Sequence, residues 1–204
     1  MRRNRMTSIT AQVRGSVTTI AVLLAVPALI GLAVMLLYSA RTQGMIRRMD
    51  AAARMKPVLE STIAENLFSV AAGRCSFKES GVEELIGDTD STLDELLAET
   101  EGSGHLQLTI ARRTMDTLEQ YVLKVRDGMK AGQPIQEIES IVDEVRNVGR
   151  LVADMLDAFT TEEIKNASEA SSRLREILIA AAAAEVLLLL IALLRTGRET
   201  RRLT

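Results

Sequence analysis

The stretch ILIAAAAAEVLLLLIALL, residues 177–194, is apolar throughout except for one carboxylic acid, Glu185, near its centre. As an α-helix these residues rise by roughly 27 Å, which is about the thickness of the hydrocarbon core of a bilayer. The same composition also fits the buried helix of a soluble protein. The rest of the chain therefore has to decide between a membrane span and a core helix.

A second apolar run, SVTTIAVLLAVPALIGLAVMLLY at residues 16–38, favours the membrane interpretation. No charged residue lies between Arg14 and Arg41, so the run is long enough for a transmembrane helix. A cleaved signal peptide is the alternative, because the chain starts with several Arg residues, but the run is longer than the apolar region of such peptides. We therefore predict two transmembrane helices, at residues 16–38 and 177–194.

Charge is segregated between the tails and the middle of the chain. Residues 41–176 contain 17 Lys or Arg and 25 Asp or Glu, a net charge of −8. The tails, residues 1–15 and 195–204, are basic, and their one acid is Glu199. By the positive-inside rule, both tails are cytoplasmic and residues 39–176 are extracytoplasmic. Five basic residues just after the first span favour the reverse orientation, but a long domain is translocated largely regardless of them: Arg41, Arg47, Arg48, Arg54 and Lys56.

The extracytoplasmic region has four amphipathic patterns and no strand pattern. Apolar residues recur every three or four positions in residues 41–72, 82–97, 108–129 and 135–176. We predict an all-α fold in which an up-down-up-down four-helix bundle is flanked by the two transmembrane helices, which continue its first and last helices. Pro57 removes a backbone hydrogen bond inside the first helix and is expected to bend it. Ser91 and Asp94 have capping-box spacing, which predicts a break in the second helix near Gly87.

A few polar residues are candidates for signalling. Arg112 and Arg113 are adjacent guanidiniums suited to bind a carboxylate, although pairing with acids of the bundle is the simpler interpretation. Glu185 lies on a stripe with three- and four-residue spacings that starts at Ile164, so we expect it to face another helix, level with Gly31 of the first span. The alternative is an acid that is merely tolerated at a helix contact.

Motifs for catalysis, cofactors, metals and nucleic acids are missing from the sequence. The single His105 and the single Cys75 have no neighbours at metal-ligand spacing, and no glycine-rich nucleotide loop is present. We therefore expect no catalytic, cofactor-binding or metal-binding residues and no nucleic-acid partner. Cys75 also excludes an internal disulfide.

Two segments carry a resemblance to a known family: AENLFSVAAGRCSF at residues 64–77 and LTIARRTMDTLEQYV at residues 108–122. They resemble the extracytoplasmic region of bacterial membrane sensor histidine kinases with LytS/YesM-like transmitters, over about residues 41–170. The resemblance implies the signal-input module of a two-component system in the bacterial cell membrane. It implies a homodimer that responds to an extracytoplasmic ligand or partner protein.

The chain departs from that family in one respect. Members continue into a transmitter with a phosphoacceptor histidine, whereas His105 lacks the flanking residues of that motif. No kinase residue carries over, so this chain is expected not to be an enzyme. Two alternatives remain: the input domain of a chemotaxis-type receptor, and a structural envelope protein without a signalling task.

Overall fold

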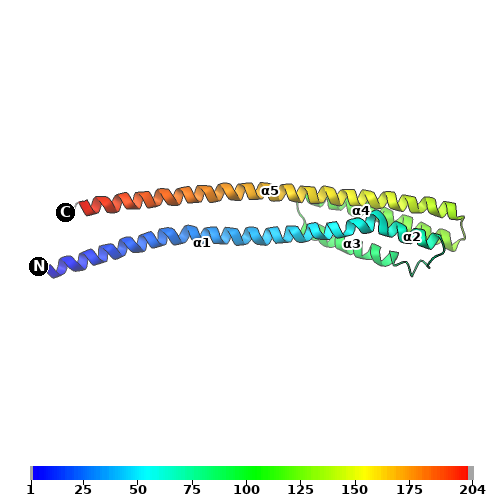
Figure 1. Ribbon diagram of the computed structural model, residues 1–204, viewed down its shortest axis with the longest axis horizontal. Helices are drawn as coiled ribbons and strands as arrows, with labels where there is room; N and C mark the ends of the chain where they lie inside the picture. The colour runs from blue at the N-terminus through cyan, green and yellow to red at the C-terminus, as the bar shows by residue number, and fades with distance from the viewer. Residues whose placement is uncertain (1, 202–204) are drawn as a thin grey trace. The chain divides into compact units, whose positions relative to one another are not determined.

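The structure, a computed structural model, describes the backbone of residues 2–201 and the side chains of residues 22, 25–192 and 194. Within these limits the chain is helical and contains no strand, which confirms the all-α prediction (Figure 1). The elements are α1 (Arg2–Pro57), the π-helical turn η1 (Val58–Thr62), α2 (Ile63–Ala71), α3 (Val82–Glu99), α4 (Ser103–Lys130) and α5 (Ile135–Arg201).

The chain divides into two compact units. Unit 1 consists of Met1–Thr42 and Ser168–Thr204, and unit 2 of Gln43–Ala167. Unit 2 is shorter at both ends than the predicted extracytoplasmic domain, residues 39–176. Both unit boundaries fall inside helices, because α1 and α5 each run without interruption from one unit into the other.

Unit 2 has one hydrophobic core, to which all six elements contribute. In Figure 1, α2, α3, α4 and the first part of α5 lie side by side. The core face of α4 matches the predicted stripe and consists of Leu108, Ala111, Met115, Leu118, Val122 and Val125. Because these positions recur every three or four residues, they lie on one side of the helix. Long aliphatic stripes of this kind supply most of the core, and Phe159 is its one fully buried aromatic among the described residues.

Helix α3 runs unbroken from Val82 to Glu99, so the predicted break near Gly87 was wrong. Gly87 is exposed in the helix interior. Ile86 and Leu93, on either side of it, are both buried in the core. Seven residues separate them, close to two turns, so one continuous helix places both on the same face. This burial outweighs the local capping pattern.

The turn between α4 and α5 depends on a glycine. Gly132 has φ of 69°, in the left-handed region that glycine adopts without a steric penalty. The N–H of Gln133 donates to the carbonyl of Gly128 at 3.0 Å, which closes the end of α4. The carbonyl of Pro134 then accepts the N–H of Glu137 at 3.0 Å and begins α5.

Unit 1 contains the apolar segments. Among the described residues, one helical stretch, Ala25–Ala71, is long and apolar enough to cross a membrane, and none of its most apolar part is buried. The second predicted span, residues 177–194, includes Leu193, whose side chain lies outside the described residues. The side chains of both predicted cytoplasmic tails, residues 1–15 and 195–204, and of most of residues 16–24 lie outside them too.

Candidate functional site: a groove beside the helix interruption at Pro57

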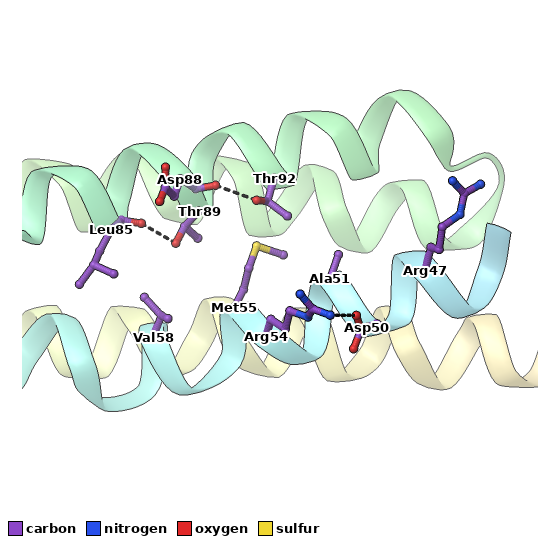
Figure 2. Close-up of a pocket in the computed structure, with 10 residues that line it drawn as sticks. All are labelled: Arg47, Asp50, Ala51, Arg54, Met55, Val58, Leu85, Asp88, Thr89 and Thr92. Atoms are coloured by element: carbon purple, nitrogen blue, oxygen red, sulfur yellow. Dashed lines mark hydrogen bonds and ion pairs between the residues drawn. The ribbon is translucent and has the colours of Figure 1, made fainter. Parts of the chain in front are cut away.

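A groove with a volume of about 400 Å³ lies between α1 and α3 in unit 2. Figure 2 shows side chains of the two helices on its opposite walls. The wall from α1 and η1 consists of Arg47, Asp50, Ala51, Arg54, Met55 and Val58. The wall from α3 consists of Leu85, Asp88, Thr89 and Thr92. This volume is within the range of small-molecule sites.

The floor of the groove is apolar. Ala51, Val58 and Leu85 are partly buried and pack against the core, and Met55 is itself a core residue. The thioether of Met55 is flexible and polarizable, so it adapts to different apolar surfaces. The floor therefore suits the apolar part of a ligand.

The rim of the groove is polar, and most of its groups are paired. Arg54 forms an ion pair with Asp50 at 2.6 Å. The hydroxyls of Thr89 and Thr92 donate to the carbonyls one turn earlier in α3, each at 2.7 Å. Two charges remain: no described residue forms an ion pair with Arg47, and none with Asp88. Figure 2 shows Arg47 at one end of the groove and Asp88 toward the other.

Pro57 marks an interruption of the helix that forms one wall. Helix α1 ends at Pro57 and the π-helical turn η1 follows, in which the N–H of Ile63 donates to the carbonyl of Val58. Pro57 has no N–H to donate to the carbonyl four residues earlier, and the wider turn begins at the next residue, Val58. The hydroxyls of Ser61 and Thr62 donate to the carbonyl of Pro57 at 3.1 and 3.2 Å. The bend expected at Pro57 stays a prediction, and the feature observed beside it is this wider turn.

The sequence contains a signal for the π-helical turn that the pattern analysis missed. Four successive core positions, Met55, Leu59, Ile63 and Leu67, are each four residues apart. In an uninterrupted α-helix the twelve residues from Met55 to Leu67 make about 3.3 turns, which would place the two side chains about 120° apart. The i→i+5 turn takes up more residues per turn and returns Leu67 to the core face.

Helix α5 crosses the π-helical turn at Gly149. A Cβ added to Gly149 would overlap the carbonyl oxygen of Leu59 and lie 3.1 Å from its carbonyl carbon. The hydrogen that glycine carries in that direction therefore points at the oxygen, a geometry of weak C–H···O contacts between helices. The two backbones approach this closely because residue 149 has no side chain. A glycine at a buried stripe position is the sequence signal for such a crossing.

Arg112 is surrounded by carboxylates between α3 and α4. Its guanidinium contacts both oxygens of Asp90 at 2.9 Å, Asp94 at 3.1 Å and Asp116 at 2.6 Å. Arg113 is exposed and takes part in none of these pairs. The structure therefore separates the two arginines, and Arg112 pairs with acids of the bundle, as in the simpler of the two interpretations.

The acids around Arg112 outnumber it. Burial raises the pKa of Asp90, and this outweighs the opposing effect of the Arg112 guanidinium. Burial also raises the pKa of Glu119, and the negative charges of Asp90 and Asp116 raise it further. Both carboxylates are therefore less favourable in their charged form in the folded protein than in water.

We expect the Glu119→Gln substitution to stabilise the protein and to flatten its pH profile. The pKa of Glu119 is raised above 4.5 in the folded protein, so the folded state holds the carboxyl proton more tightly than the unfolded chain does. The free energy of unfolding is therefore highest below pH 4.5 and falls as the pH rises through the raised pKa. The glutamine variant lacks this loss, so its advantage should grow across that window and level off above it. Chemical unfolding of the full-length protein in detergent at a series of pH values measures this, with Glu137→Gln as the matched control. Parallel profiles of wild type and Glu119→Gln would contradict it.

An ion pair joins α1 to α5 near the end of unit 2. Arg48 Nη2 and Glu163 Oε2 are 2.6 Å apart, and their side chains are only 19% and 9% exposed. The Nε of Arg48 is buried without a partner among the described residues.

The prediction that Ile164 begins an inward stripe was wrong, because Ile164 is 55% exposed and Glu163 is buried instead. Glu163 follows Phe159 by one turn on the same face, and Arg48 neutralises it there.

Glu185 and Gly31 both lie in unit 1. Glu185 is partly covered, whereas the adjacent Ala184 and Val186 are exposed. Gly31 is partly covered as well, and an added Cβ there would meet no atom within 4 Å. Among the described residues, nothing lies close to Gly31 in the direction of an added Cβ, and its contact with Glu185 stays a prediction.

No group of three or more His, Cys, Asp and Glu side chains in the described part of the chain is arranged to hold a metal ion. Comparison with known protein families, characterised proteins and solved structures finds no match. What supports a function is therefore the geometry of the chain together with the resemblance of residues 64–77 and 108–122.

Proposed function

We propose that the chain is the membrane-anchored signal-input module of a bacterial sensor histidine kinase. In this proposal, residues 16–38 and 177–194 are transmembrane helices, both tails are cytoplasmic, and residues 39–176 form an extracytoplasmic up-down-up-down bundle. One observation carries it: α5 is a single helix that begins in the core of unit 2 and runs through the second apolar segment to Arg201. A continuous helix is stiff, so a shift in the core displaces the apolar segment.

The surface of unit 1 supports the membrane assignment. Large apolar side chains are exposed along both of its helices: Leu29, Met35, Leu36 and Leu37 on α1, and Ile177, Ile179, Leu187 and Leu190 on α5. A continuous exposed surface of this kind is unfavourable in water and matches lipid chains. The four arginines in each tail favour a cytoplasmic location for both ends.

The proposal includes a homodimer and an extracytoplasmic stimulus. Two input modules side by side bring the two copies of residues 177–194 together. A displacement of the helices in one module then changes the contacts made by the second module. Glu185 is the polar group in that span and is suited to a hydrogen bond across such a contact. A bond of this kind biases the span between two arrangements without being needed for folding.

We expect Glu185 to set the output of the module. The full chain is fused through its C-terminus to the transmitter of a histidine kinase of known activity, and autophosphorylation is measured in membranes. Glu185→Leu removes a hydrogen bond worth about 0.6 to 2 kcal/mol and should change the activity roughly 3- to 30-fold. Glu185→Gln keeps a hydrogen-bonding group and should stay close to wild type.

Cross-linking reports the arrangement of the spans in the same membranes. Cysteines replace Gly31 and Ala184 in a Cys75→Ser background, and the cross-linking yield is compared with and without Glu185→Leu. A changed yield together with changed autophosphorylation supports the proposal. Equal yields and equal activities in all variants would mean that Glu185 is only tolerated and that the chain is a scaffold.

A further inference from the structure

We propose that the groove between α1 and α3 binds a short peptide with free ends, with its ammonium group at Asp88 and its carboxylate at Arg47. That this peptide acts as a stimulus rests on the proposed signal-input function. The binding itself rests on the charges, length and floor of the groove.

The charges select a ligand with one positive and one negative end. The groove has two acids and two basic residues, and the pair Arg54–Asp50 at 2.6 Å neutralises one of each. Arg47 and Asp88 have no ion-pair partner within the described residues. A purely anionic ligand would pair with Arg47 but leave the negative charge of Asp88 without a partner. A purely cationic ligand would pair with Asp88 but leave the positive charge of Arg47 without a partner. A ligand with opposite charges at its two ends satisfies both.

The length of the groove selects a short chain over a single amino acid. Its α1 wall extends from Arg47 to Val58, a rise of roughly 16 Å, and its α3 wall from Leu85 to Thr92, roughly 10 Å. The charges of a free amino acid are only one Cα apart. An extended chain of about four residues spans roughly 13 Å and carries its charges at the two ends. A tetrapeptide is therefore comparable in length with the two walls of the groove, whereas a single amino acid is much shorter.

The floor and the α3 wall complete the match. Met55, Val58 and Leu85 offer apolar surface to the side chains of the peptide. The hydroxyl oxygens of Thr89 and Thr92 already donate their protons within α3, but they keep lone pairs that accept hydrogen bonds from peptide N–H groups. Thr89 is almost fully buried, so its position is fixed by packing.

The groove is also placed to transmit binding. Val58, which lines it, is the first residue of η1, and Leu59 next to it contacts Gly149 of α5 through its carbonyl. A peptide in the groove thus contacts η1, a turn whose hydrogen bonds are not α-helical. Turns of this type are frequent at functional sites.

Thermal unfolding of the full-length protein in detergent tests the binding, with tetra-alanine as the probe. Millimolar tetra-alanine with free ends should raise the midpoint. Acetylation of its amino end or amidation of its carboxyl end should each weaken binding about two- to fivefold, because both partners are exposed. No shift with the free peptide, or equal shifts with the blocked peptides, would overturn the proposal.

Variants assign the two ends. The Asp88→Asn variant should bind the free and the acetylated peptide equally, because it has already lost the contact with the ammonium group. The Arg47→Gln variant should bind the free and the amidated peptide equally, because it has already lost the contact with the carboxylate. The charge-exchanged double variant Arg47→Asp/Asp88→Arg should regain the binding that each single change loses. Arg113→Gln, which removes an exposed arginine outside the groove, is the matched control and should bind as wild type does. Failure of the double variant to bind better than the singles would overturn the assignment of the ends.

The fusion protein separates this inference from the proposed function. If tetra-alanine binds but autophosphorylation does not respond to it, the groove is a peptide site, and the proposal that this peptide is a stimulus of the module is wrong. If Glu185→Leu changes the output but tetra-alanine does not bind, the signal-input function stands and the peptide inference is wrong.

Discussion

The Gly149→Ala substitution should lower the free energy of unfolding of the protein by about 3 kcal/mol. The added methyl group would overlap the carbonyl oxygen of Leu59, which belongs to the backbone of η1 and has no rotamer by which to move away. Relief requires α5 and η1 to separate, and this separation loosens Leu118, which also lies at the crossing, 3.5 Å from the position of the methyl carbon. Urea unfolding of the full-length protein in detergent, followed by circular dichroism, measures the loss.

Gly87→Ala is the matched control for this change. Gly87 is an exposed interior residue of α3, and a Cβ there would meet no atom within 4 Å. Alanine is the better helix former, so the same chemical substitution should here stabilise the protein by about 0.5 to 1 kcal/mol. A Gly149→Ala variant as stable as wild type would show that α5 does not cross η1 this closely.

Breaking the ion pair between Arg48 and Glu163 should have the second largest effect. Glu163→Ala leaves the mostly buried guanidinium of Arg48 without its counter-charge, at an expected cost of about 2 kcal/mol. This value is below that of a fully buried pair because Arg48 keeps some contact with water. Arg48→Met leaves the more deeply buried carboxylate unpaired and should cost at least as much. Both values come from the same unfolding experiment.

The double variant Arg48→Met/Glu163→Leu distinguishes a lost pair from lost packing. Replacing both partners with apolar side chains removes the unpaired charge, so most of the stability should return. The matched control is Arg54→Met, which breaks a pair of highly exposed side chains and should cost little. Additive losses in the Arg48 and Glu163 variants would contradict an interaction between these two residues.

The stripes of the core could be predicted because each of them is a property of one helix. The spacing of Leu108, Met115 and Val122 shows which side of α4 is apolar, whatever that side packs against. The turn before α5 also depends on local residues, since Gly132 and Pro134 act on their own backbone. The break expected at Gly87 failed for the opposite reason. A capping pattern describes three or four residues, whereas Ile86 and Leu93 are held in a core to which other helices contribute.

The features of the candidate site depend on which helices are neighbours, and the sequence does not state this. Arg48 and Glu163 are 115 positions apart, so neither residue predicts that the other will neutralise it. The groove likewise requires α1 beside α3 at a particular height. The sequence favours a pairing of Arg112 with acids of the bundle, but three acids are suitably placed only once α3 lies against α4. Arg113, adjacent in sequence, is exposed and pairs with none of them.

The π-helical turn also has a consequence for comparing this helix with others. A chain that lacked one residue between Val58 and Thr62 would form an ordinary α-helix there and still place Met55 and Leu67 on the core side. Two such chains would share the same buried contacts while their sequences differ by a gap of one residue in mid-helix. An alignment of this segment should therefore permit a single-residue gap at Val58–Thr62, and a periodicity profile should be reset there. If the helix is analysed as one unbroken 3.6-residue repeat, the core residues before the turn and those after it are assigned to different faces.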